Sequence, residues 1–193
     1  LHDSGITNVV ASLGTALSRN QITLLSRATE SKKILLNVDS DNAGIRAANR
    51  AISEVENLAI QGQLDLRILQ LPSGKDPDEF LKDNSSSEYE ALAAKSPLWM
   101  DWQIDQSLKD LDLSKSDQFQ EAVGNLVSLL GKLPQTAIRT HYLQKVAQRL
   151  SGGHGRFALQ LEEDLRNQIS GQRWHGRSKK IDKPLEISLR ERS

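Results

Sequence analysis

Two pairs of aspartates have the spacing and the position to take part in metal chemistry. Asp39 and Asp41 come directly after the apolar run Ile34–Val38, and Asp76 and Asp78 follow the next predicted strand. In an open α/β sheet, ligands bind beyond the carboxyl ends of the strands. Carboxylate oxygens are the ligands that Mg²⁺ prefers. These acids therefore predict a divalent-metal site of the kind used in phosphoryl transfer.

Helix capping is a simpler explanation for the same aspartates. Ser40 or Asp41 would cap the helix that follows, and Asp76 and Glu79, with a proline between them, match the start of another helix. Asp78 is not needed for that cap. Four acids that lie close together also repel one another unless cations lie among them. The spacing alone leaves both interpretations open.

Residues that could bind a phosphate lie near these acids and in one earlier turn. Gly44, near the start of a predicted helix, would let a phosphate approach the backbone amides. In the earlier turn, Gly14 permits unusual backbone angles, and Ser12 or Thr15 has a hydroxyl to donate. Lys75 places a cation beside the second acidic pair. Alone, the turn is a weak signal, because most such turns only connect a strand to a helix.

Two arginines, Arg46 and Arg50, lie one turn apart on the predicted helix after Asp41. They fall opposite its apolar stripe. Their side chains are either solvated or close enough to the acids to bind phosphates. The sequence pattern does not distinguish these two interpretations.

The first half of the chain alternates apolar runs with helical patterns, which is typical of a parallel α/β sheet. We expect buried strands at residues 7–11, 34–38 and 64–69. Ser18 and Gln21 predict a capping box for the first helix. Gly62 predicts the end of the second.

From about residue 96 no strand pattern is found. Helices are expected at residues 98–111, 117–133, 137–150 and 156–170, with short breaks that imply antiparallel packing. Trp99 and Trp102 are expected to pack in the core, with a surface for a partner as the alternative. Residues 171–193 carry seven basic and three acidic residues with little apolar periodicity, and are expected to form a linker or tail.

The composition narrows the class of protein. Lys and Arg total 25, as do Asp and Glu, so any nucleic-acid binding must come from local patches. There is no cysteine and the four histidines are scattered, so no zinc site is predicted. No apolar run approaches the roughly 18 residues that span a bilayer. We expect a soluble, cytoplasmic protein without a membrane partner.

Three segments resemble the TOPRIM core of bacterial replicative DNA primases. Gly5–Leu17 resembles G-I-x-x-x-V-A-S-L-G-T-A-L, Asp39–Gly44 resembles D-x-D-x-A-G, and Leu71–Leu81 resembles L-P-x-G-K-D-P-D-E-[FY]-L. The D-x-D of the second motif is shared by the wider TOPRIM group of topoisomerases, recombination proteins and nucleases, whereas the other two motifs are more specific to primases. The resemblance is strong over residues 1–95 and looser over 96–170.

This resemblance implies an α/β fold of the TOPRIM type, Rossmann-like with a mainly parallel sheet, over residues 1–95. An all-α subdomain of the polymerase region follows over residues 96–170, and a basic linker or tail over 171–193. It also implies that Mg²⁺ or Mn²⁺, without zinc, is bound by the four acids of the site: Asp39, Asp41, Asp76 and Asp78.

The implied function is synthesis of RNA primers for DNA replication by metal-dependent nucleotidyl transfer. The implied substrates are a single-stranded DNA template and ribonucleoside triphosphates. The replicative helicase is an implied partner through a C-terminal domain that this chain is expected to lack. Two other interpretations remain: another TOPRIM protein, such as a nuclease or topoisomerase, or a non-catalytic module that binds a partner.

The resemblance also predicts what the chain lacks. It is expected to begin after the family's E-G-Y-x-D strand, and so to lack one acid, the first strand, the zinc module and the basic half of the polymerase domain. We therefore expect no primer synthesis by this chain alone, and template-dependent RNA synthesis would contradict that. An exposed sheet edge would also lower its stability.

Overall fold

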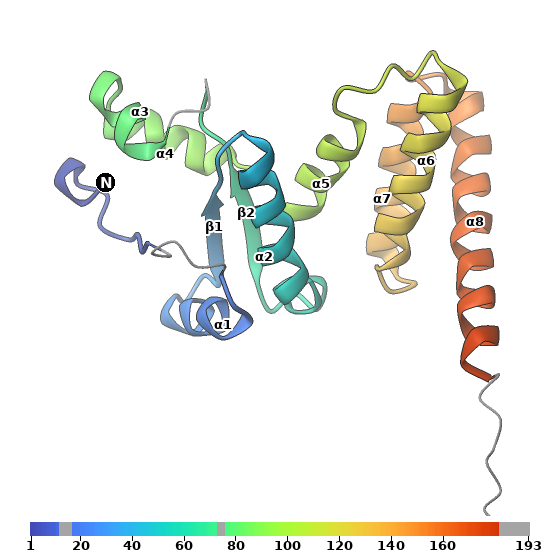
Figure 1. The fold of residues 1–193 in the computed structure, drawn as a ribbon, viewed down its shortest axis with the longest axis horizontal. Helices are drawn as coiled ribbons and strands as arrows, with labels where there is room; N and C mark the ends of the chain where they lie inside the picture. Colours follow the sequence, from blue (N-terminus) through green and yellow to red (C-terminus); the bar gives the residue numbers. More distant parts are fainter. Residues whose placement is uncertain (12–16, 73–75, 182–193) are drawn as a thin grey trace, which may run out of the picture. The chain divides into compact units, whose positions relative to one another are not determined.

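The computed structural model describes residues 1–11, 17–72 and 76–181, with side chains as far as Gly171. The chain divides into two compact units, Leu1–Gln106 and Ser107–Ser193. Figure 1 shows the elements of each unit. In the described parts of the chain, no helix combines the length and the apolar character that a membrane crossing needs.

The first unit is built on a parallel pair of strands. β1 (Lys33–Asn37) lies beside β2 (Asp65–Leu69), with Asn37 opposite Leu69 at the carboxyl end of the pair. The backbone N–H of Val38 extends the pairing by donating to the carbonyl oxygen of Leu69 at 3.0 Å. The two strands place five apolar side chains in the core: Ile34, Leu36, Leu66, Ile68 and Leu69. The expected strands at 34–38 and 64–69 are therefore confirmed.

One α-helix lies just before the first strand in the chain, and a second α-helix lies between the two strands. α1 (Arg19–Ala28) begins with the predicted capping box between Ser18 and Gln21. α2 (Asn42–Ile60) connects the two parallel strands, as a parallel pair requires. Gly62 lies just past its end, as expected, and its φ of 70° is the left-handed conformation that glycine tolerates best.

The predicted strand at residues 7–11 is wrong. This segment follows a short 3₁₀ helix, η1 (His2–Ser4), and contains no strand. Val10 is 71% exposed, although its β-branched neighbours suggested burial. A strand needs a partner for its backbone groups. Among the described residues the sheet has two strands, and neither pairs with this segment.

Three short helices follow β2. They are α3 (Pro77–Asp83), α4 (Ser86–Lys95) and α5 (Trp99–Leu108), of which α4 was not expected from the sequence pattern. The rings of Phe80 and Tyr89 lie 6.4 Å apart and tie α3 to α4 in a small apolar cluster.

Helix α5 packs with the first unit, so the division falls after Gln106, whereas the change in sequence pattern suggested residue 95. Trp102 on α5 donates its indole N–H to the side-chain oxygen of Gln70 at 3.0 Å. Leu98 forms an antiparallel bridge with Arg67 of β2. Trp99 and Trp102 are buried, which confirms their predicted place in the core.

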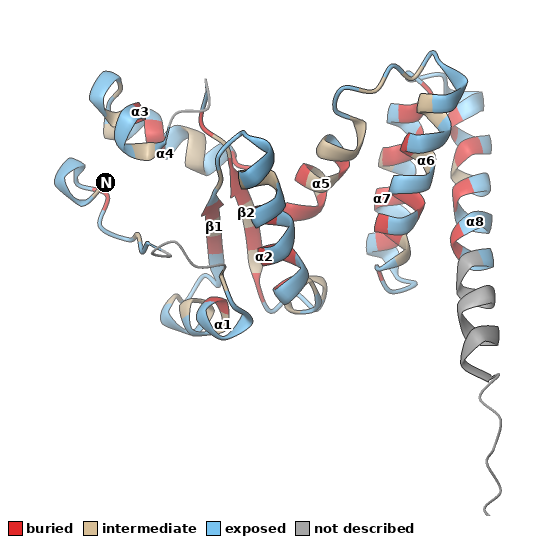
Figure 2. Ribbon diagram, in the orientation of Figure 1, coloured by how far each residue is buried: buried red, intermediate tan, exposed pale blue. Residues whose placement is uncertain are grey.

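The second unit packs three helices together: α6 (Ser116–Gly131), α7 (Ala137–Leu150) and α8 (Gly155–Ile181). Figure 2 shows their buried residues on the sides that face one another. The turn between α7 and α8 uses Gly152 and Gly153, both at positive φ. The three helices were expected from the apolar periodicity.

Helix α8 continues beyond residue 170, where the sequence pattern suggested its end. Its backbone is helical as far as Ile181, so the first part of the expected tail is helix. The first proline after its start is Pro184, and the residues before it are mostly tolerant of helix. Residues 182–193 lie outside the described part of the chain.

Candidate functional site

The two acidic runs follow adjacent parallel strands, as the sequence predicted. β1 and β2 end opposite each other at Asn37 and Leu69. Asp39 comes two residues after the first strand, and Asp76 comes seven residues after the second. Both runs are exposed to solvent. The arrangement places carboxylates beyond the carboxyl ends of the strands, where open α/β sheets bind their ligands.

These carboxylates do not form a closed cluster. Within the described ranges, no group of three or more acidic or histidine side chains lies close enough to hold a metal ion. Oxygen donors match the preference of Mg²⁺, so the chemistry of the donors fits a divalent cation, although their arrangement is not a completed coordination shell.

Asp41 is the cap of α2, which confirms one of the two explanations drawn from its spacing. Its Oδ1 atom accepts a hydrogen bond from the backbone N–H of Gly44 at 2.6 Å. Such a cap satisfies one of the amides that have no partner inside the helix. The second oxygen, Oδ2, is not part of this cap. A capping role and a metal-binding role are therefore compatible for Asp41.

Gly44 leaves room for the backbone of Asp39. A Cβ atom on Gly44 would lie 2.9 Å from the Cβ of Asp39 and closer still to its carbonyl oxygen. The turn that contains Asp39 therefore folds against the first turn of α2, in space that any larger residue would fill. Sequence reasoning missed this contact. Its signal was the fixed distance between the first aspartate and the glycine in D-x-D-x-A-G.

Asp76 and Asp78 differ in their surroundings. Asp76 caps α3, because its Oδ1 accepts from the backbone N–H of Glu79 at 2.7 Å and Pro77 occupies the first turn. This confirms the predicted helix start. Asp78 lies one turn before Lys82, with 3.7 Å between Oδ2 and Nζ, and its side chain is 82% exposed. An exposed pair of this kind contributes little to stability, so Asp78 has no evident structural role.

The remaining candidates fall outside the described part of the chain. These are the predicted phosphate-binding residues of the early turn and the lysine beside the second acidic pair: Ser12, Gly14, Thr15 and Lys75. Arg46 and Arg50 are described, and both are exposed on α2.

Comparison with known families agrees with this geometry. Residues 1–81 match the family described as Toprim-like, and residues 100–154 match the family described as DnaB-helicase binding domain of primase. The parallel strands, the crossover helix α2 and the acids beyond the strand ends thus define a Toprim-type α/β fold followed by a helical region.

Individual proteins within that class also resemble the chain. The chain is 58% identical, over its whole length, to a DNA primase of Synechococcus elongatus, and covers 28% of that protein. It is 42% identical over 88% of its length to a DNA primase of Synechocystis, and covers 27% of it. The chain is thus similar to DNA primases along its length, and it spans little more than a quarter of these curated relatives.

Solved structures agree. A DNA primase domain from Pseudomonas aeruginosa is 28% identical with a TM-score of 0.61, over 84% of this chain and 50% of that one. The E. coli primase catalytic core is also 28% identical with a TM-score of 0.62, over 77% of this chain and 47% of that one.

Proposed function

We propose that this chain forms part of a DNA primase and that, within the whole protein, it takes part in the synthesis of RNA primers on a DNA template. The observation that carries the proposal is the 58% identity to a DNA primase along the full chain. The acids beyond two adjacent parallel strands add a chemical reason. The reaction is nucleotidyl transfer: the 3′-hydroxyl of the primer attacks the α-phosphorus of a ribonucleoside triphosphate, and pyrophosphate leaves.

The residues proposed to hold Mg²⁺ or Mn²⁺ are the four acids of the site: Asp39, Asp41, Asp76 and Asp78. The cation would neutralise negative charge on the transferring phosphoryl group. Asp41 and Asp76 also cap α2 and α3 through one oxygen each, which fixes the direction of both side chains. Further phosphate contacts are proposed for Gly44 and for the candidates outside the described residues: Ser12, Gly14, Thr15 and Lys75.

The second unit is proposed to belong to the polymerase region as well. Residues 1–106 make up about 55% of the 193-residue chain (106/193). The likeness to the Pseudomonas primase domain covers 84% of the chain, so it extends into the second unit. This supports a helical subdomain in that region.

Single-stranded DNA and the replicative helicase are the proposed macromolecular partners. One similar structure is a DnaG primase catalytic domain bound to ssDNA, 26% identical with a TM-score of 0.60 over 78% of this chain. From the sequence, the helicase is expected to bind through a separate C-terminal domain. The match of residues 100–154 to a helicase-binding family supports an additional contact within this chain.

The rival enzyme classes, a nuclease or topoisomerase of the TOPRIM type, receive less support, because the relatives compared above are DNA primases. A non-catalytic module in which the acids only cap helices differs from the primase in one measurable property. The module predicts no specific affinity for a divalent cation, whereas the primase requires it.

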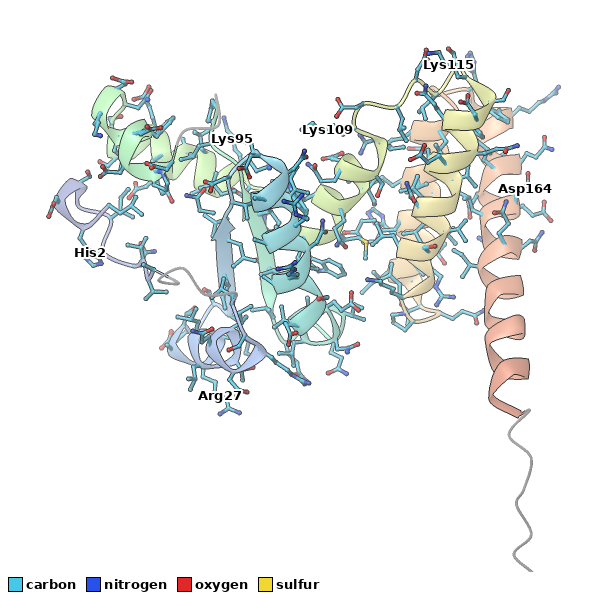
Figure 3. All side chains as sticks on the ribbon, in the orientation of Figure 1. His2, Arg27, Lys95, Lys109, Lys115 and Asp164 are labelled. Atoms are coloured by element: carbon cyan, nitrogen blue, oxygen red, sulfur yellow. The ribbon has the colours of Figure 1, made fainter. Side chains whose placement is uncertain are left out.

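Titration of Mn²⁺, followed by the relaxation of solvent water, separates these functions. The test variant is Asp39→Asn/Asp78→Asn, since neither residue caps a helix. The control is Asp117→Asn/Asp164→Asn, which removes two carboxylates from the second unit; Asp164 is labelled in Figure 3. We expect weaker binding only in the test variant. Equal binding by all three proteins would contradict the proposed metal site.

A further inference from the structure

Helix α2 has one buried side and one exposed side. Its buried residues, Ala48, Ala51, Ile52 and Val55, form the side that packs into the core. The opposite side is exposed and carries a row of polar side chains at intervals of four, four, three and four residues: Asn42, Arg46, Arg50, Ser53 and Asn57. All but Ser53, whose hydroxyl donates to the carbonyl oxygen of Arg50 at 2.8 Å, keep side-chain N–H donors for a ligand. Residues at this spacing lie one above another on a helix. We call these five residues the α2 donor stripe.

The charge of the stripe is concentrated in two neighbouring arginines. Arg46 and Arg50 are separated by one turn, about 6 Å along the helix axis. Within the described residues, neither guanidinium forms a hydrogen bond or an ion pair. Glu54, exposed one turn beyond Arg50, is not paired with it. Like charges at this spacing destabilise a helix, and an anion bound between them removes the repulsion.

The stripe begins at the acid site. Asn42, its first member, directly follows Asp41, the cap of α2. Its last member, Asn57, is fifteen residues further, or about 22 Å along the helix. A nucleic-acid strand that passes the acids would therefore find polar side chains along most of α2.

We propose that the α2 donor stripe binds the phosphodiester backbone of single-stranded DNA, with Arg46 and Arg50 each contacting one phosphate. The planar guanidinium group suits two hydrogen bonds to a phosphate, and side-chain amide groups such as those of Asn42 and Asn57 commonly bind backbone oxygens. The chain has no net charge, so such binding must come from a local patch. The choice of DNA rests on the proposed function, which brings a single-stranded template to this unit.

If the stripe contacts phosphates, its affinity for DNA should fall as the salt concentration rises. Each phosphate neutralised on a single strand contributes about 0.7 to the slope of log affinity against log salt. Arg46→Gln/Arg50→Gln should therefore lower that slope by about 1.4, and each single variant by about 0.7. The loss of affinity between about 50 and about 200 mM salt should then be about sevenfold smaller in the double variant. Glutamine keeps a similar helix propensity, so α2 should remain folded.

The experiment measures the fluorescence anisotropy of a labelled oligothymidylate as the 193-residue chain is added at several salt concentrations. The matched control is Arg19→Gln/Arg27→Gln, which removes two exposed arginines of α1 in the same unit; Arg27 is labelled in Figure 3. We expect the control to keep the native slope and Arg46→Lys/Arg50→Lys to keep most of it. Circular dichroism melts verify that every variant is folded.

Three results would overturn the inference. They are an unchanged slope in the glutamine variants, absence of oligothymidylate binding by the native chain, and an effect confined to oligouridylate of the same length. The Mn²⁺ titration depends on the acids and not on Arg46 or Arg50. A failure of the donor stripe can therefore be told apart from a failure of the proposed metal site.

Discussion

The backbone of Asp39 occupies the space beside Gly44 that a side chain would fill. A Cβ on Gly44 would lie 2.9 Å from the Cβ of Asp39, which is closer than real Cβ atoms approach. The same glycine donates its N–H to Asp41 at 2.6 Å. One small residue therefore holds both aspartates of the first acidic pair, one by leaving room and the other by a hydrogen bond.

Replacing this glycine should disturb the acid site. Gly44→Ala forces the turn at Asp39 away from α2, and overpacking of this kind costs about 1–3 kcal/mol. We expect a lower free energy of unfolding in urea, together with weaker binding of Mn²⁺.

Gly124 provides the control, because it lies in the middle of α6 and a Cβ there would meet no atom within 4 Å. Gly124→Ala should stabilise the protein by about 0.5–1 kcal/mol through helix propensity alone. Similar effects of the two substitutions would show that the contact between Gly44 and Asp39 has no special weight.

The two roles of Asp41 can be separated by substitution. Asparagine caps a helix about as well as aspartate, whereas alanine does not, and the loss of a cap costs about 1 kcal/mol. Asp41→Asn should keep the native stability and Asp41→Ala should lower it, as measured by urea unfolding. Both should weaken Mn²⁺ binding, because both remove the carboxylate. If Asp41→Asn destabilises the protein as much as Asp41→Ala, the cap is not the source of the effect.

Local signals in the sequence predicted the caps but not the packing around them. The hydrogen bonds of Asp41 and Asp76 join residues three apart, so the pattern of residue types was enough to find them. The exposure of Val10 depends on whether a distant segment pairs with it, which no local pattern contains. For the same reason the sequence placed the acids at neighbouring strand ends without fixing the distances between their carboxylates.

Lys32 should be a site where glycine stabilises the protein. Its φ of 52° is in the left-handed region, where a residue with a Cβ is disfavoured by about 1–2 kcal/mol. Lys32→Gly removes that strain, and the entropy lost by glycine offsets part of the gain. We expect a net increase of up to about 1 kcal/mol in the free energy of unfolding.

The neighbouring residue tests this explanation. Lys33 is the first residue of β1, and glycine weakens a strand, so Lys33→Gly should destabilise the protein. If both substitutions raise the free energy of unfolding, the removal of a positive charge, and not the relief of backbone strain, would explain the effect.

The start of α4 should respond to acid. The backbone N–H of Ser85 donates to the Glu88 carboxylate at 2.8 Å, and the hydroxyl of Ser85 donates at 2.9 Å. These hydrogen bonds, the backbone one first, hold the pKa of Glu88 below its usual value of 4.5. The carboxylate therefore stabilises the folded state above pH 4.5, and this contribution disappears as the pH falls through the lowered pKa.

Glu88→Gln tests that dependence, because glutamine also completes a capping box but does not titrate. Thermal melts of both proteins between about pH 7 and about pH 3 should show the native protein losing its advantage over the variant below pH 4.5. Other carboxylates titrate in both proteins, so the difference between the two curves isolates Glu88. A difference that stays constant across this range would mean that the ionised carboxylate adds nothing to the start of α4.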